Sequence, residues 1–192
     1  MKTISTIISN VLVSILLFSC QAQESNQAKE TNVVRSRTSI DFDWRFIQKD
    51  IVDAQTIDFD DSQWRLLNVP HDWSIEGEYN ESNPSGIAGA YLPTGIGWYR
   101  KNITIENLQN DDKYFVEFDG VYMNSDVWIN GQHLGNRPYG YISFSYDLTP
   151  YLKDGNNIIA VKVDHSKAPS GRWYTGSGIY RHVWLTKTKH VE

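Results

Sequence analysis

Cysteine is almost absent from this chain, which limits how a fold can be stabilised. The 192 residues include one cysteine, Cys20, so no disulfide can form within the chain. A folded part must therefore depend on its hydrophobic core. The hydrophobic fraction of 40% and the length fit one ordinary globular domain, with no room for a second domain of normal size.

Basic side chains are also in the minority. The chain has 18 Lys and Arg against 23 Asp and Glu, which gives a net charge of −5. Nucleic acids are bound by clustered positive charge, so this balance argues against a nucleic-acid partner. It argues more weakly against electrostatic binding to an anionic membrane surface.

Metal and nucleotide motifs are missing. None of the five histidines belongs to a His-x-x-x-His pair, and there is no cysteine cluster, so no zinc site is predicted. The acidic group Asp58, Asp60 and Asp61 lacks the glycine and terminal glutamate of an EF-hand loop, and no Gly-x-Gly-x-x-Gly element is present. No spacing marks a catalytic carboxylate pair. We therefore expect no metal and no cofactor.

Only one long apolar run occurs, from Ile4 to Phe18, and polar residues interrupt it. It is too short and too polar to cross a bilayer, which needs about 20 apolar residues, and it follows a basic Lys2, as in a signal peptide. The run ends in Leu17-Phe18-Ser19-Cys20, which resembles a bacterial lipobox. This pattern predicts a lipoprotein signal peptide over 1–19 and acylation of Cys20. The alternative is an ordinary secretion signal with an incidental cysteine.

Either interpretation takes the mature protein out of the cytoplasm. In the first, Cys20 anchors it to a membrane, in the periplasm or at the cell surface. Residues 20–37 are polar and aromatic-free, so we expect a flexible tether there. The folded domain is expected over residues 38–192.

Aromatic residues are abundant, with 7 Trp, 11 Tyr and 7 Phe, which excludes disorder of the whole chain. Hydrophobic residues alternate with period two, and Asn130-Gly131 separates two apolar runs as a hairpin turn does. Short strands that recur about every 10 residues predict an all-β fold, a β-sandwich or jelly roll. The strands are expected at 98–105, 114–118, 126–129, 132–134, 141–146, 157–163 and 179–186, with a helical turn only at 148–153 after Asp147.

Tryptophan and tyrosine rings can pack against the C–H faces of sugars, and they also fill cores. We expect core packing for Trp44, Trp98, Trp128 and Trp184, which lie in strand-like runs. Trp173 and Tyr174 lie in a glycine-rich loop, and the sequence leaves two roles open for them, contact with a ligand and packing against the domain.

Seven segments resemble, in order, the N-terminal sugar-binding jelly-roll domain of family 2 glycoside hydrolases, the group of β-galactosidases, β-glucuronidases and β-mannosidases. The resemblance covers about Ser39 to the C-terminus. The segments are Phe42-Asp43-Trp44-Arg45-Phe46, Leu67-Asn68-Val69-Pro70-His71-Asp72-Trp73, Gly97-Trp98-Tyr99-Arg100-Lys101, Phe118-Asp119-Gly120-Val121, Val127-Trp128-Ile129-Asn130-Gly131, Gly155-Asn156-Asn157 and Gly176-Ser177-Gly178-Ile179-Tyr180-Arg181-His182-Val183-Trp184. The form of the last segment looks most like β-galactosidase-type members.

The resemblance implies a galactose-binding-like jelly roll that docks on a catalytic barrel and lends a loop to its active site. It places Arg172, Trp173 and Tyr174 near the sugar. In well-known galactosidase and glucuronidase members an acidic residue stands six positions before Gly178, where this chain has Arg172. A second family contact, an asparagine, is replaced by Leu92. The contacts to sugar hydroxyls therefore cannot be the same as in those members, and the resemblance does not identify the sugar that this chain binds.

The family's catalytic glutamates lie on a barrel of about 250 residues, which this chain does not contain. We therefore expect a non-catalytic, sugar-binding fragment of a β-galactosidase-type enzyme. Its partners would be a β-linked carbohydrate, the catalytic barrel and a lipid-anchored membrane. The alternative is a stand-alone surface carbohydrate-binding lipoprotein without catalysis.

Overall fold

The structure is a computed structural model that describes residues 35–167 and 174–189. Cys20, the expected signal peptide, and the loop residues Arg172 and Trp173 lie outside the described residues. In the part described, no helix has the length and apolar character needed to cross a bilayer.

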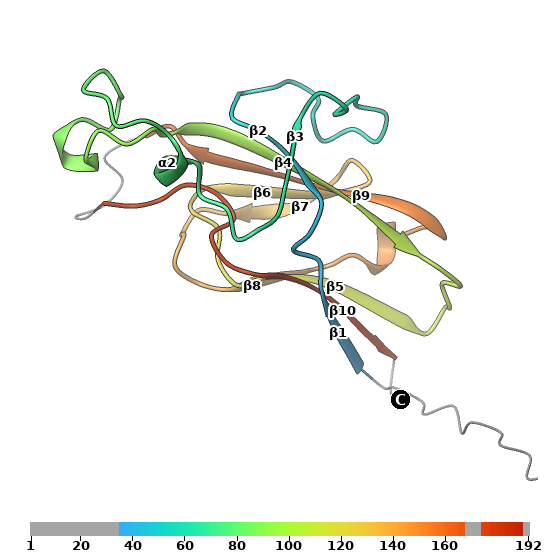
Figure 1. The fold of residues 1–192 in the computed structure, drawn as a ribbon. Helices are drawn as coiled ribbons and strands as arrows, with labels where there is room; N and C mark the ends of the chain where they lie inside the picture. Colours follow the sequence, from blue (N-terminus) through green and yellow to red (C-terminus); the bar gives the residue numbers. More distant parts are fainter. Residues whose placement is uncertain (1–34, 168–173, 190–192) are drawn as a thin grey trace, which may run out of the picture. The chain divides into compact units, whose positions relative to one another are not determined.

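Two antiparallel sheets form the domain, in two layers (Figure 1). The four-stranded sheet has the order β1 (Arg35–Ser39), β10 (Val183–Lys189), β5 (Asp112–Phe118) and β8 (Phe144–Asp147). The six-stranded sheet has the order β3 (Arg65–Leu67), β2 (Trp44–Ile47), β4 (Gly95–Ile105), β9 (Gly155–His165), β6 (Ser125–Ile129) and β7 (Gln132–Arg137). The predicted all-β sandwich is confirmed.

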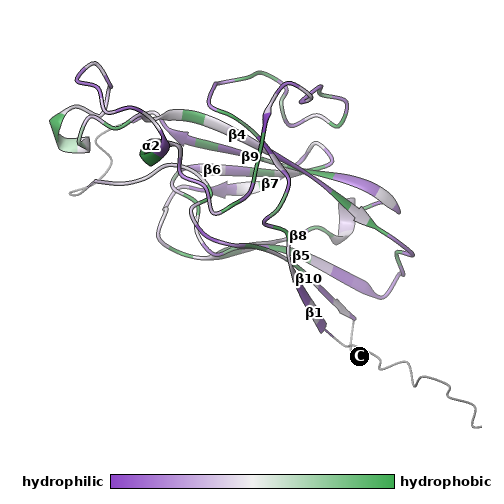
Figure 2. Ribbon diagram, in the orientation of Figure 1, coloured by the Kyte–Doolittle hydropathy of each residue, from purple (hydrophilic) through white to green (hydrophobic). Residues whose placement is uncertain are grey.

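The core lies between the sheets because each strand buries alternate residues. Along β5, Tyr114, Val116 and Phe118 are buried while the residues between them are partly exposed. Phe118 stacks on Phe144 of β8 with ring centroids 5.1 Å apart. Figure 2 shows the same alternation of hydrophobic and hydrophilic residues along the strands. Burial of these apolar faces is the main force that holds the two layers together.

The β6–β7 hairpin forms where Asn130-Gly131 predicted it. Both turn residues have positive φ, 50° at Asn130 and 80° at Gly131. The Asn130 side chain also accepts a hydrogen bond from the Ile158 N–H (2.9 Å) and donates to the Tyr151 carbonyl (2.9 Å). The turn is thereby fixed to β9 and to the short 3₁₀ helix η2 (Thr149–Tyr151).

Several elements differ from the sequence expectation. The expected strand at 141–146 begins only at Phe144, and the expected strand at 179–186 begins only at Val183. The helical turn near 148–153 is η2, where the Asp147 carboxylate accepts a hydrogen bond from the Thr149 N–H (2.8 Å). It is not the only helical element: the helix α2 (Trp73–Glu76) and the 3₁₀ helix η1 (Ile87–Gly89) were missed. Both are too short to show helical periodicity.

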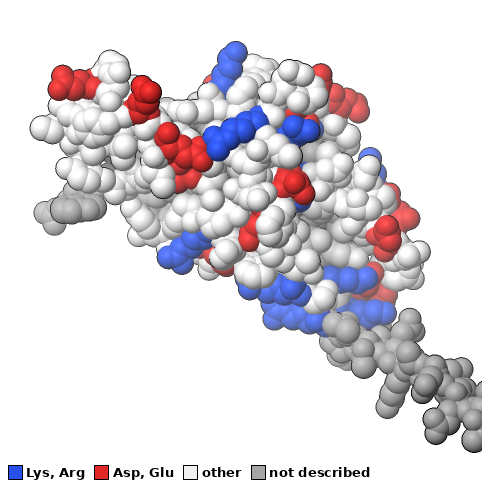
Figure 3. Space-filling model, in the orientation of Figure 1, with Lys and Arg blue, Asp and Glu red and all other residues white. Residues whose placement is uncertain are grey.

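Strand β1 begins at Arg35, so it includes the last three residues of the segment expected to be a tether. It pairs along its length with β10, from Arg35↔Thr188 to Ser39↔Trp184. The Arg37 guanidinium lies 4.0 Å from the Trp184 ring centroid and its Nε donates to Glu117 (2.9 Å). These contacts order a strand that lacks hydrophobic side chains. Lys and Arg gather at this edge of the molecule (Figure 3).

The four tryptophans expected in the core divide into two kinds. Trp44 and Trp98 are buried, whereas Trp128 and Trp184 are only half-buried. Trp44 packs between the sheets. Trp98 belongs to a second hydrophobic cluster, with Trp64 and Ala160, against which Trp128 packs. The prediction was wrong for Trp128 and Trp184 because alternation puts them on outer sheet faces.

Candidate functional site

Two motif segments far apart in the sequence meet at one end of the sandwich. The segment with Asp72 leads into α2, and the segment 174–182 leads into β10. Their backbones are joined by hydrogen bonds from His71 N to Ile179 O (2.8 Å) and from Trp73 N to Ser177 O (3.1 Å). Gly178 also exchanges two backbone hydrogen bonds with Tyr122, at 2.8 and 2.9 Å.

Asp72 connects the two segments. Its Oδ1 accepts hydrogen bonds from Ser74 N (2.9 Å), which caps α2, and from Ser177 N (2.8 Å). A side chain at Gly176 would have no space, because its Cβ would overlap the Oδ2 atom of Asp72. The carboxylate therefore holds the loop by its backbone and requires glycine there.

A buried chain of hydroxyls continues inward from this contact. Ser74 Oγ donates to Pro93 O (2.6 Å), so it accepts from Ser177 Oγ, 2.6 Å away. Ser177 Oγ in turn lies 2.6 Å from His165 Nδ1. Because the Ser177 hydroxyl already donates to Ser74, it accepts here, so Nδ1 of His165 is protonated and donates. Burial lowers the pKa of His165 and favours the neutral ring. The loop is thus held by a fully directed row of hydrogen bonds.

His71 is the second buried histidine at this end. Its Nε2 lies 3.0 Å from Glu76 and its Nδ1 lies 2.7 Å from the Tyr99 hydroxyl. The Arg65 guanidinium, bonded to Glu76 at 2.6 and 3.0 Å, lowers the pKa of that carboxyl to about 2. Glu76 therefore accepts from Nε2–H, and Tyr99 donates to Nδ1. Burial lowers the pKa of His71, which again favours the neutral ring.

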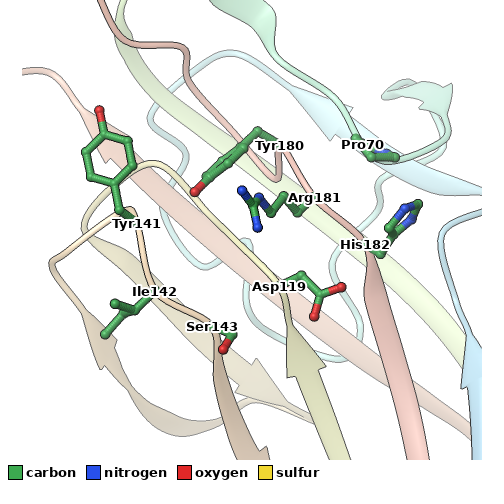
Figure 4. Close-up of a pocket in the computed structure, with 8 residues that line it drawn as sticks. All are labelled: Pro70, Asp119, Tyr141, Ile142, Ser143, Tyr180, Arg181 and His182. Atoms are coloured by element: carbon green, nitrogen blue, oxygen red, sulfur yellow. The ribbon is translucent and has the colours of Figure 1, made fainter. Parts of the chain in front are cut away.

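Two hollows open on the surface over this rigid base. We call the smaller, of about 160 Å³, the tyrosine hollow; it is lined by Asp72, Tyr122, Tyr141, Tyr174, Thr175, Gly176 and Tyr180. We call the larger, of about 730 Å³, the arginine hollow; it is lined by Pro70, Asp119, Tyr141, Ile142, Ser143, Tyr180, Arg181 and His182 (Figure 4). Tyr141 and Tyr180 separate the two hollows and line both.

Among the residues that the structure describes, the hollows present aromatic faces and the guanidinium of Arg181. Tyr141 and Tyr174 are 58% and 57% exposed, although large apolar rings are usually withdrawn from water. Tyr180 is held by a hydrogen bond from its hydroxyl to Gly140 O (2.8 Å). Arg181 lies beside the Tyr180 ring (Figure 4), and no carboxylate of the described residues is within ion-pair distance of it. Flat rings and an available guanidinium suit hydroxyl-rich ligands such as sugars.

The carboxyl groups of the described residues give no support for a hydrolytic centre at this end of the domain. A glycosidase needs an acid whose pKa is raised and a second carboxylate a few ångströms away. Where the pKa of a described Asp or Glu is shifted, it is lowered, as at Glu76, Asp60, Asp112 and Glu117. Asp72 is committed to two backbone N–H groups. Among the side chains described, no three His, Asp or Glu converge as a metal site requires.

Of the three sugar-contact residues expected from the sequence, Tyr174 lines the tyrosine hollow. Arg172 and Trp173 lie outside the described residues. Sequence reasoning missed Tyr122, Tyr141, Tyr180 and Arg181. Tyr180 and Arg181 stand inside a quoted motif and could have been noticed there, whereas nothing in the sequence brings Tyr122 and Tyr141 to the loop.

Comparisons with known proteins agree with this geometry. The family described as "Glycosyl hydrolases family 2, sugar binding domain" matches residues 34–189. The β-galactosidase BoGH2A of Bacteroides ovatus is 55% identical over 155 residues, which are 80% of this chain and 18% of that protein. A β-glucuronidase of Formosa agariphila is 36% identical over 188 residues, covering 88% of this chain and 19% of that protein.

The fold is also found in solved structures. A β-glycosidase from Bacteroides vulgatus matches with a TM-score of 0.76 and 55% identity, over 78% of this chain and 20% of that one. The chain thus spans about a fifth of the length of these relatives. The matched region contains every strand of both sheets and both segments of the site, and the chain belongs to glycosyl hydrolase family 2, as its sugar-binding domain.

Proposed function

We propose that this domain forms one wall of the sugar pocket of a β-galactosidase-type glycoside hydrolase. The observation that carries the proposal is the tyrosine hollow, where the exposed Tyr174 stands on a loop whose backbone is fixed from beneath by Asp72 and Ser177. A rigid base under an exposed ring is what precise positioning of a sugar requires. Arg172 and Trp173, just before Tyr174, would contact the same sugar.

The catalytic groups would come from the remainder of the enzyme. In this proposal the sandwich, which begins with β1 at Arg35 rather than at the expected residue 38, is the family's galactose-binding-like jelly roll and docks on a catalytic barrel. The bound ligand would be a β-linked carbohydrate. Arg172 carries a positive charge where acidic residues stand in well-known members, so its five donors would face sugar hydroxyls or a carboxylate of the barrel.

The N-terminal segment would determine where the enzyme works. We propose that residues 1–19 are a lipoprotein signal peptide, that residues 20–34 form a flexible tether, and that acylated Cys20 anchors the enzyme in the periplasm or at the cell surface. The polar composition of 20–34 supports the tether, and the lipobox-like sequence supports the anchor.

A domain exchange tests the enzymatic role. Residues 35–189 would replace the corresponding N-terminal domain of the Bacteroides ovatus β-galactosidase, and hydrolysis of nitrophenyl β-galactoside would be measured. We expect the chimera to hydrolyse it, whereas the 192-residue chain alone stays at background. Turnover by the chain alone, lost on mutation of one of its own carboxylates, would contradict the proposal. So would a folded chimera without activity.

A further inference from the structure

A second hollow lies on the outer face of the six-stranded sheet. Trp98 of β4 and Trp128 of β6 project from this face, while their neighbours Tyr99 and Val127 are buried in the core between the sheets. The hollow has a volume of about 610 Å³. The β2–β3 connection, residues 48–64, borders it and lies on the side of the sheet away from the four-stranded layer (Figure 1).

The floor of this hollow is a pair of indole rings. Trp98 and Trp128 stack with centroids 5.3 Å apart and an interplanar angle of 28°. They can do so because the residue paired with Trp128 on the intervening strand β9 is the small Ala160. Trp98 is only 3% exposed, so its ring is fixed; Trp128 is half-buried and remains accessible.

Trp128 is less buried than the cluster beneath the 48–64 connection. The buried members of that cluster are Ala54, Trp64, Trp98 and Ala160, and Trp128 is one of the partly buried residues that pack against it. Because Trp128 also lines an open hollow together with polar side chains, its ring is placed to contact a ligand there.

Polar side chains surround the rings in fixed orientations. Lys162 Nζ pairs with Asp50 at 2.8 Å and lies 5.7 Å from the Trp98 ring centroid. On the other side, His133 Nε2 lies 2.7 Å from Asp126 Oδ1, and the His133 ring lies 5.1 Å from that of Trp128. All four groups keep some exposure. Carboxylates, an ammonium and an imidazole around a ring face are the groups that hydrogen-bond vicinal hydroxyls.

We propose that this hollow, which we call the tryptophan hollow, is a second carbohydrate site that holds one neutral sugar unit of a β-linked glycan. The C–H face of the sugar would pack on Trp128, and its hydroxyls would bond Asp126, His133 and Lys162. Acidic residues outnumber the single lysine among the lining side chains, with Asp50, Asp53 and Asp126 against Lys162, so a uronate would be disfavoured. The site is independent of catalysis and would retain the enzyme on its polymer.

The position supports a separate role. The tyrosine hollow lies at the end of the sandwich around Tyr174, whereas the tryptophan hollow is built on the outer face of the β4-β9-β6-β7 sheet. No residue lines both hollows. A glycan held here would be bound outside the proposed sugar pocket, as a long polymer can be.

The test is titration of the 192-residue chain with cellotetraose and with β-1,4-galactotetraose, monitored by ¹H–¹⁵N NMR of the indole N–H groups. The variants are Trp128→Ala and His133→Ala, with Trp184→Ala as the matched half-buried tryptophan on the other sheet. We expect at least one tetrasaccharide to shift the Trp98 and Trp128 signals, and a β-1,4-linked oligomannuronate to shift neither. Trp128→Ala should weaken binding roughly tenfold, about 1.4 kcal/mol, and Trp184→Ala should not.

Three results would overturn the site. They are no shift at Trp98 and Trp128 with either tetrasaccharide, binding unchanged in both Trp128→Ala and His133→Ala, or equal binding of the uronate oligomer. His133→Ala leaves the stacked Trp98 and Trp128 rings in place, so it still tests the site if Trp128→Ala does not fold. None of these results bears on the enzymatic role, which is measured separately by hydrolysis in the domain exchange.

Discussion

Gly178 shows at the scale of one residue how the candidate site constrains the sequence. Its φ is +119°, and a Cβ there would overlap the Tyr99 hydroxyl and lie 2.8 Å from the His71 carbonyl. The backbone is therefore confined both by its own conformation and by two groups of the buried network.

We predict that Gly178→Ala destabilises the fold by about 3 kcal/mol, because it combines overpacking with a positive φ. Gly155→Ala is the matched control, since Gly155 also has a positive φ, +86°, but open space around it. It should cost only about 1 kcal/mol. Urea unfolding of both variants measures the difference, and equal losses would show that the close contacts are unimportant.

The two buried histidines predict how stability depends on pH. The folded state lowers the pKa of His71 and His165, so below about 6.5 the unfolded chain binds more protons than the folded one. Stability is therefore fully present above pH 6.5 and is lost as the pH falls. In the folded state the pKa of Glu76 is lowered to about 2, from about 4.5 in the unfolded chain, so the stability it contributes is lost mainly below about pH 5.

The free energy of unfolding should accordingly fall between pH 7 and pH 5, by up to about 1.4 kcal/mol per pH unit for each histidine. His165→Asn should flatten this slope whatever its effect at pH 7. If the dependence of the unfolding free energy on pH is unchanged in His165→Asn, a group other than His165 is responsible for it.

Sequence reasoning could name candidate site residues only inside a recognisable segment. Tyr174 was expected near a sugar because of the family resemblance; the structure places Tyr174 at the tyrosine hollow, and its contact with a sugar stays a prediction. The place of Tyr141 at the hollow could not be predicted, because hydrophobic periodicity identifies helices and strands but does not show which loops lie together in the fold. The roles of Asp72 and Ser177 depend on hydrogen bonds between segments about 100 residues apart, which no local pattern contains.

At the scale of elements, one arginine holds the β2–β3 connection of the six-stranded sheet. Arg100 of β4 is only 2% exposed. Its guanidinium donates to Asp61 (2.7 Å), Ala54 O (2.6 Å) and Thr56 O (2.9 Å), with longer contacts to Ile57 O and Phe59 O at 3.5 Å. These bonds take the place of regular structure in residues 48–64.

Arg100→Met should therefore cost about 3–5 kcal/mol, because it leaves Asp61 and several carbonyls without their buried partner. Arg45→Met removes one bond to the same connection, at 3.3 Å to Trp64 O, and should cost no more than about 1.5 kcal/mol. Thermal unfolding and limited proteolysis at residues 48–64 measure both effects. Comparable melting temperatures and cleavage rates would contradict the role assigned to Arg100.

The long strands could be predicted, whereas the short strands β1 and β3 could not. β4, β5 and β9 show several cycles of alternation, and the turn residues Asn130-Gly131 mark the β6–β7 hairpin. β1 and β3 have three to five mostly exposed residues, so their sequences carry no hydrophobic period. They are strands because a neighbouring strand offers hydrogen bonds, which is a tertiary effect.

At the scale of the whole molecule, the proposed anchor depends on one side chain. Cys20→Ser should move the protein from the membrane fraction to the soluble exported fraction, because the sulfur receives the first lipid. Ser19→Ala, which keeps a small residue before the cysteine, is the control and should leave the distribution unchanged. Membrane partitioning that persists in Cys20→Ser would show that the run from Ile4 to Phe18 is itself the anchor.

The most direct measurement concerns Arg172 in the chimera with the Bacteroides ovatus catalytic part. Loss of a charged hydrogen-bond donor to the sugar or barrel is worth about 1.5–3 kcal/mol, so Arg172→Ala should lower kcat/KM roughly 10- to 150-fold while the melting temperature stays the same. Tyr151→Ala is the control: Tyr151 is an exposed tyrosine that lines neither the tyrosine hollow nor the arginine hollow, so this variant should leave kcat/KM unchanged. An Arg172→Ala chimera with unaltered kcat/KM would contradict the assignment of this loop to the sugar pocket.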